Sequence, residues 1–138
     1  MENKKPSLTG LFNKANSGSK HAVFCGDLLH CRDIIHLNHW KTRGTGSFAA
    51  HEALGDLYDA LQGHADDITE LLQSYTGVLN ISVPASTAEE PLSYLKKFRT
   101  NLISHVKLVE GDMPDVSNTI QDLLADVSKT IYKLENLS

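Results

Sequence analysis

The chain has 138 residues, of which 41% are hydrophobic and 22% are charged, and its formal net charge is −4. This length and composition predict one globular domain and exclude general disorder. The acidic balance argues against a strongly nucleic-acid-binding domain, which is normally basic, and no apolar run is long enough for a membrane helix.

The first 18 residues are predicted to be a polar, weakly basic tail ahead of a helical domain at 19–138. Lys4 and Lys5 lie in this tail, with Glu2 as its only acidic residue. Cys25 and Cys31 are the only cysteines, and six positions apart in a helical pattern they cannot easily bridge each other. We expect two buried free thiols, which suit a reducing cytoplasm.

Apolar residues recur every three or four positions in the first two segments, which is the spacing of one helix face. The first helix is expected from about Ser19 to Lys41–Arg43, where basic side chains and the following Gly44 suit a helix C-terminus. The second is expected from Ser47, a suitable N-cap, to Gly77. Their stripes are Phe24, Leu28, Cys31, Ile35 and His39, and then His51, Leu54, Tyr58, Leu61, Ala65, Ile68, Leu72 and Tyr75.

A longer connection at 76–90 separates the second helix from the third. Residues 86–89 have the pattern of a capping box, Pro91 suits the first turn of the third helix, and Gly111 ends it. The fourth begins at Asp112 or Asp115. The two stripes are Leu92, Leu95, Phe98, Leu102, Val106 and Val109, and then Val116, Ile120, Leu123, Val127, Ile131 and Leu134. Four such helices predict an all-α fold, an antiparallel four-helix bundle.

Two histidines extend these stripes where a bundle core would be apolar. His39 ends the first stripe and His51 begins the second, and the eleven residues between them include two glycines. Both lie near the same end of adjacent helices, so their rings can approach each other. A core or loop-end role is the plain alternative for each. Because neutral imidazole is the commonest nitrogen ligand for transition metals, the pair is a candidate metal site.

The second helix also carries five carboxylates on one face, at Glu52, Asp56, Asp59, Asp66 and Glu70. They form either a solvated acidic face or, in part, a cation site. Asp66 lies fifteen residues after His51, which is ~22 Å along a helix axis, so one rigid helix cannot bring both to one site. They can meet only if a second copy of the helix lies antiparallel, with a two-fold axis near Asp59 and Ala60.

The stretch HWKTRGTGSFAAHEALGDLYDALQGHADDITELL resembles the signature of the Dps family, the ferritin-like DNA-binding proteins from starved cells. The matching residues are His39, Trp40, Gly44, Phe48, His51, Asp66 and Glu70, and TIQDLLADVSKTIYKLENL resembles the family's last helix. The resemblance covers about residues 19–137 and implies a ferritin-like bundle. It also implies iron, with His39 and His51 of one chain and Asp66 and Glu70 of its mate as ligands, and oxidation of Fe(II), typically with peroxide. Trp40 would take up stray oxidising equivalents.

Two features depart from the family pattern. Gly55 stands four residues after His51, where the family usually has an aspartate as a third ligand. Either Asp56 or Glu52 substitutes for it, or the site is weakened or lost. The connection at 76–90 is shorter than in the family, where a small helix there helps to pack a shell of twelve subunits. We therefore expect self-association at least as a two-fold dimer, with the dodecameric shell left open.

Three functions are compatible with this resemblance and its departures. The first is a Dps-like iron-binding protein that oxidises and stores Fe(II) at a site shared across a dimer. The second is a non-catalytic structural or interaction protein that keeps the fold with a degenerate site. DNA association through Lys4 and Lys5 is a third possibility, and phosphate binding by so few cations would weaken steeply with salt. We expect a cytoplasmic protein with no membrane partner.

Overall fold

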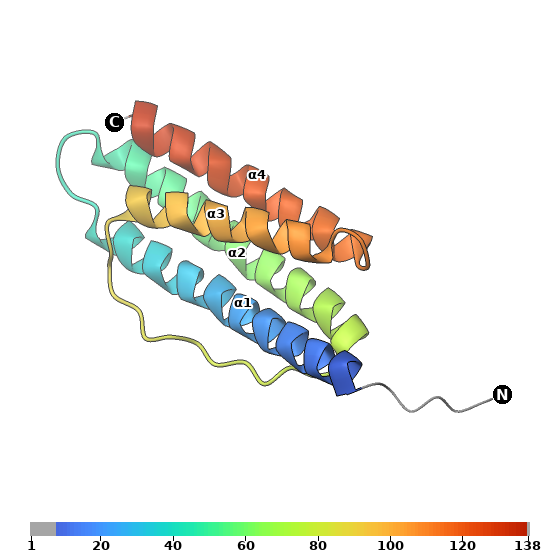
Figure 1. Cartoon of the computed structure of the whole chain (residues 1–138). Coiled ribbons are helices and arrows are strands. Elements are labelled where there is room, and N and C mark those ends of the chain that lie inside the picture. Colours follow the sequence, from blue (N-terminus) through green and yellow to red (C-terminus); the bar gives the residue numbers. More distant parts are fainter. Residues whose placement is uncertain (1–7, 138) are drawn as a thin grey trace.

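The computed structural model describes the backbone of residues 8–137 and the side chains of residues 19–137. It contains α1 (Leu8–Lys41), α2 (Ser47–Thr76), α3 (Pro91–Val109) and α4 (Pro114–Asn136) (Figure 1). Residues 8–137 form no strand, so the predicted all-α class is confirmed. None of the four helices combines the length and the hydrophobicity that crossing a membrane requires.

Neighbouring helices of the bundle run antiparallel, and one long crossover makes this possible (Figure 1). α1 packs against α2, α2 against α4 and α4 against α3, whereas α1 and α3 meet along a smaller seam. Residues 77–90 carry the chain back along the bundle from the end of α2 to the start of α3. A bundle with one such crossover has ferritin-like connectivity. The predicted antiparallel four-helix bundle is therefore confirmed.

The core consists of the apolar positions that recur every three or four residues along each helix. The fully buried positions of the predicted stripes are Phe24, Leu28, Cys31 and Ile35 in α1, Leu54, Leu61, Ala65, Ile68 and Leu72 in α2, Leu95, Phe98, Leu102 and Val109 in α3, and Val116, Ile120, Leu123, Val127 and Ile131 in α4. Of the predicted positions, His51 and Tyr75 are exposed, at the ends of α2. Cys25 and Cys31 are buried and unpaired, as expected, and burial raises the pKa of both thiols.

The first helix is longer than the sequence predicts. α1 begins at Leu8 rather than near Ser19. Gly10 and Gly18 lowered the expected helicity of this segment, but a glycine inside a helix costs only about 1 kcal/mol. No proline, which would break the helix, occurs between Leu8 and the end of α1.

Two helix N-termini use other caps than those predicted. Gly46, with a φ of 79°, precedes α2, so Ser47 is its first helical residue and not its N-cap. α3 has no capping box. The carboxylate of Glu90 accepts hydrogen bonds from the backbone N–H groups of Leu92 at 3.1 Å and Ser93 at 2.8 Å. These bonds satisfy two of the backbone donors that a helix leaves free at its start.

The crossover lies along α1 and runs in the same direction. Ser86 Oγ is 2.9 Å from Nδ1 of His30, and the side-chain amide of Asn38 donates to the carbonyl oxygen of Glu89 at 2.7 Å. The segment has no helix or strand of its own. It therefore depends on contacts with α1 for its position.

Gly26 allows this close approach. A Cβ atom added to Gly26 would lie 2.2 Å from the carbonyl oxygen of Ser82. That distance is far inside van der Waals contact, and the atom it meets is backbone and not the flexible end of a side chain. A larger residue at Gly26 would therefore push the crossover away from α1.

The variant Gly26→Ala is expected to lower the free energy of unfolding by about 1–3 kcal/mol, the usual cost of overpacking. Denaturant unfolding of the full chain measures this change. Gly63→Ala is the matched control, because nothing lies within 4 Å of a Cβ atom there. Gly63 is inside α2, so its replacement should raise the free energy of unfolding by up to about 1 kcal/mol through helix propensity. Similar effects of the two variants would contradict the packing described for Gly26.

Candidate metal centre

A tight turn holds the end of α1 against the start of α2. Gly44, with a φ of 95°, and Gly46, with a φ of 79°, adopt the left-handed conformation, which glycine reaches without steric cost. The backbone N–H of Ser47 donates to the carbonyl oxygen of Gly44 at 3.1 Å. The turn therefore places the last residues of α1 beside the first turns of α2.

His39 of α1 and His51 of α2 lie face to face across this junction. Their ring centroids are 3.8 Å apart, with 17° between the ring planes. Nδ1 of His39 is 2.8 Å from the carbonyl oxygen of His51, and Nδ1 of His51 is 2.8 Å from the carbonyl oxygen of His39. A carbonyl oxygen can only accept a hydrogen bond, so both Nδ1 atoms must carry a proton.

This arrangement leaves both Nε2 atoms as lone-pair donors. A neutral imidazole has a single N–H group, and the carbonyl bonds place it on Nδ1. Residues 19–137 form no hydrogen bond to either Nε2 atom. In metal sites one ring nitrogen is commonly held by a backbone carbonyl or a carboxylate while the other binds the metal. The two side chains are therefore oriented as metal ligands would be.

Gly55 makes room for the His39 ring. A Cβ atom added to Gly55 would lie 2.9 Å from Cε1 and 3.1 Å from Nδ1 of His39. An aspartate at this position, as in the Dps pattern, could not coexist with the ring where it stands. The departure from the family pattern at Gly55 is therefore part of the packing of the histidine pair.

A pocket of about 320 Å³ opens beside the pair. His39 and His51 line it together with Glu52, Asp56 and Asp59. All three carboxylates are exposed. The predicted ligand Asp56 and its alternative Glu52 thus share one pocket with the imidazoles.

His36 forms part of the wall of this pocket, although helical spacing puts it off the core stripe of α1. Its ring stacks on Tyr58, with centroids 3.9 Å apart, and its centroid is also 3.9 Å from that of the Trp40 ring. Trp40 is 59% exposed. The predicted oxidisable residue therefore lines the pocket and contacts a half-buried histidine. This contact depends on the packing of α1 against α2, so spacing within α1 could not reveal it.

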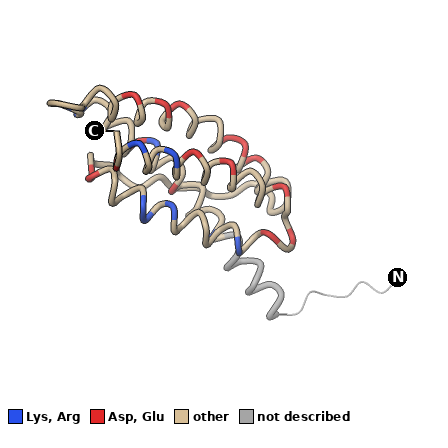
Figure 2. Tube along the Cα trace, turned by 90° about the horizontal axis from the view of Figure 1, so that it is seen from above, with Lys and Arg blue, Asp and Glu red and all other residues tan. Residues whose placement is uncertain are grey.

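Asp66 and Glu70 do not line this pocket. Both are exposed on α2. Figure 2 shows a row of acidic residues along the upper edge of the bundle. Among the side chains that the structure describes, no three His, Cys, Asp or Glu residues are grouped so as to hold a metal ion. A single chain therefore brings the two imidazoles together but does not add Asp66 and Glu70 to them.

Residues 39–134 match a protein family that is described as a family of unknown function (DUF5856). The match begins at His39 and takes in α2, α3 and most of α4, which is more than half of the chain. The chain belongs to this family.

Two curated relatives of this DUF5856 protein are named DNA protection during starvation protein, one from Streptococcus suis strain P1/7 and one from Streptococcus suis. Each is 30% identical over 111 residues, which make up 80% of this chain and 55% of the relative. The chain thus spans about half the length of these relatives. No solved structure matches it with significance. The similarity is distant, and it supports the Dps resemblance drawn from the histidine motif.

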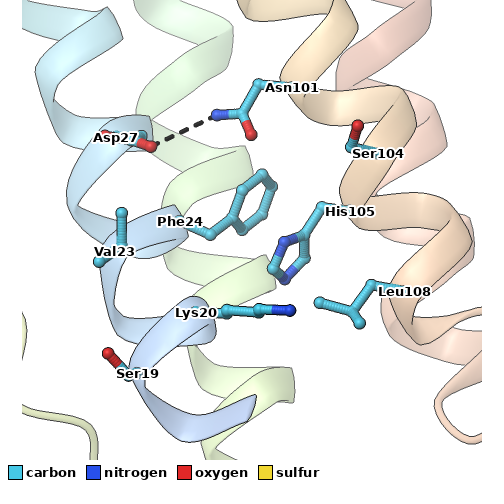
Figure 3. A pocket seen from close by; sticks show the side chains of 9 residues that line it. All are labelled: Ser19, Lys20, Val23, Phe24, Asp27, Asn101, Ser104, His105 and Leu108. Atoms are coloured by element: carbon cyan, nitrogen blue, oxygen red, sulfur yellow. Dashed lines mark hydrogen bonds between the residues drawn. The ribbon is translucent and has the colours of Figure 1, made fainter. Parts of the chain in front are cut away.

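A second histidine pair lies in the seam between α1 and α3 of this DUF5856 chain. Nδ1 of His21 is 3.0 Å from Nε2 of His105, and the side chains are only 2% and 6% exposed. The His105 ring stacks on Phe24 at 3.8 Å with 3° between the planes (Figure 3). Burial lowers the pKa of both imidazoles, that of His105 to about 4. His105 lies three residues after Leu102 and four before Val109, and this spacing was the available signal that it is buried.

The predicted nucleic-acid contacts Lys4 and Lys5 lie outside the described residues. Their role in binding DNA stays a prediction.

Proposed function

We propose that two copies of this chain pair across a two-fold axis, and that each shared site binds Fe(II) and promotes its oxidation. His39 and His51 of one copy and Asp66 and Glu70 of the other would be the ligands. The observation that carries the proposal is the histidine pair, whose Nδ1 atoms are held by backbone carbonyls while both Nε2 atoms stay available. Imidazole and carboxylate ligands with open positions suit iron that reacts with an oxidant.

The pairing follows from the length of α2. His51 and Asp66 are too far apart on one helix to share a metal, but an antiparallel second copy centred near Asp59 and Ala60 brings position 51 opposite about position 68. Gly63 has nothing within 4 Å of a Cβ position and would let the two helices approach closely. Trp40 and Phe48, at the histidine end of the bundle, are 59% and 72% exposed. A second copy would cover part of this apolar surface.

The proposed reaction balances with peroxide as the oxidant. Two Fe(II) ions each lose one electron, and one peroxide molecule takes up both electrons and two protons to give two water molecules. Iron is the substrate here. The imidazoles would hold the ion as lone-pair donors, and the carboxylates would favour the more highly charged product. Asp56 would supply a third carboxylate from the pocket. Trp40, in the pocket wall, would take up stray oxidising equivalents.

A second candidate function is a structural or interaction protein without metal chemistry. Gly55 favours it, because the usual aspartate ligand is missing and the His39 ring occupies its space. The same experiment distinguishes the two functions.

Addition of Fe(II) without oxygen, followed by peroxide, is expected to produce a rise in near-ultraviolet absorbance from Fe(III). The variant His51→Ala should lower the initial rate at least tenfold, because it removes one ligand. His51 is exposed, so the variant should fold. His64→Ala is the matched control: His64 lies on the same helix but is bonded to Asp126 at 2.7 Å, outside the pocket. Equal rates for the wild type and His51→Ala would overturn the proposal, and no rise in the wild type would favour the non-catalytic function.

A further inference from the structure

All charged residues of α2 other than histidine are acidic. Its six carboxylates are Glu52, Asp56, Asp59, Asp66, Asp67 and Glu70, and no Lys or Arg occurs in the helix. All six are exposed. Figure 2 shows a row of acidic residues along the upper edge of the bundle, with no basic residue among them. α3 shows the opposite pattern, with four basic residues and no acidic one. The charge of α2 is therefore not balanced along its own surface.

The outer face of α2 is also poor in apolar surface. Between Phe48 and Tyr75, no large hydrophobic side chain of α2 is exposed. Homodimer interfaces are usually more apolar than the rest of the protein surface. Apart from Trp40 and Phe48 at the histidine end of the bundle, two copies of this face therefore have little apolar surface to bury when they pair.

The proposed dimer brings two such acidic faces together. Packed helices have axes about 8–10 Å apart, and salt screens charges only beyond about 10 Å at 0.1 M ionic strength. Asp59 of each copy would lie next to the two-fold axis, facing its counterpart. The exposed side chains of Lys41 and Arg43 lie at the histidine end of α1 and would approach the partner's acidic segment near position 68. They would not offset the charge at the axis.

A metal ion shared between the copies changes this balance. It neutralises carboxylates, and it binds the dimer more tightly than the monomer because its ligands come from both copies. By linkage, such an ion drives dimerisation, and dimerisation raises the affinity for the ion by the same factor. We propose that divalent transition-metal ions control the assembly of this protein, which is monomeric without them and pairs when they occupy the shared sites. This inference rests on the proposed function.

Sedimentation equilibrium of the full chain tests the inference, first with a chelator at low salt and then with Zn(II). Zn(II) has no redox chemistry and accepts imidazole and carboxylate ligands. We expect a monomer in chelator and at least a tenfold lower dimer dissociation constant with Zn(II). Mg(II), which prefers oxygen ligands and keeps its water, should have a much smaller effect at the same concentration, and sodium chloride of equal ionic strength should not replace Zn(II).

Two matched variants separate charge at the axis from charge elsewhere. Asp59→Asn removes a carboxylate beside the proposed axis and should tighten dimerisation in chelator. Asp122→Asn makes the same change at an exposed position of α4 and should leave dimerisation unchanged. Equal effects of the two variants would overturn the inference.

The remaining outcomes distinguish this inference from the proposed function. A wild-type dimer that is as tight in chelator as in Zn(II) would overturn metal control but leave the shared site standing, and the iron assay would then judge that site separately. Equal dimerisation by Mg(II) and Zn(II) would overturn control through the imidazoles. A chain that stays monomeric with Zn(II) would overturn both the inference and the shared site.

Discussion

Replacement of Gly55 by alanine is expected to lower the affinity of the protein for Zn(II) or Co(II) by ten- to a hundredfold, the usual effect of disturbing groups that orient metal ligands. The added Cβ atom would lie 2.9 Å from Cε1 of His39, so the ring would have to move. Its movement would break the reciprocal bonds that hold the His39 and His51 rings face to face. Calorimetric titration measures the affinity.

Unfolding experiments and two further variants show whether this effect is local. Gly55→Ala should also cost about 1–3 kcal/mol in the free energy of unfolding, as overpacking usually does. Gly111→Ala, in the turn before α4, is the control, since nothing lies within 4 Å of a Cβ atom there, and it should leave metal affinity unchanged. Gly55→Asp introduces the aspartate of the Dps pattern. If that variant bound metal more tightly than the wild type, the account of Gly55 as space for the ring would be wrong.

The buried pair His21 and His105 is expected to make the protein less stable as the pH falls from about 6.5 to about 4. The pKa of His105 is lowered from 6.5 to about 4, first by burial and then by His21. Between these values the unfolded chain binds a proton that the folded chain does not, so acidification favours unfolding. At ~1.4 kcal/mol per pH unit, His105 alone accounts for about 3 kcal/mol. The lowered pKa of His21 acts in the same direction, and the loss levels off once the folded state is protonated too.

Denaturant unfolding at several pH values in this range measures the effect. Lys20 and Asp27 line a neighbouring cavity of about 420 Å³ together with His105 (Figure 3). The variant His105→Gln removes the titrating ring and leaves these two charged residues unchanged. The difference in unfolding free energy between neutral and mildly acid pH should therefore shrink in this variant. If it stayed as large as in the wild type, the acid sensitivity would have to come from other groups.

The sequence by itself determined the presence of four helices and their assembly into a bundle. Apolar residues such as Leu54, Leu61 and Leu72 recur with the period of a helix, and burial of one face of each helix is what stabilises a bundle. The lengths of the helices and of their connections were enough to predict an antiparallel bundle, but not which helices pack against each other. The approach of His39 to His51 could be predicted too, because a short turn joins the ends of two adjacent helices. The fixed rise per residue of a helix likewise separates His51 from Asp66 within one chain.

The tertiary structure alone decided how side chains of different helices meet. That Gly55 is filled by the His39 ring, that His36 stacks on Tyr58 and that His21 bonds to His105 all depend on the rotation and spacing of packed helices. Sequence periodicity specifies the buried face of a helix, but not which residue of a neighbour lies opposite a given position. That choice is made by close packing of the whole core, in which each side chain fills the space that the others leave.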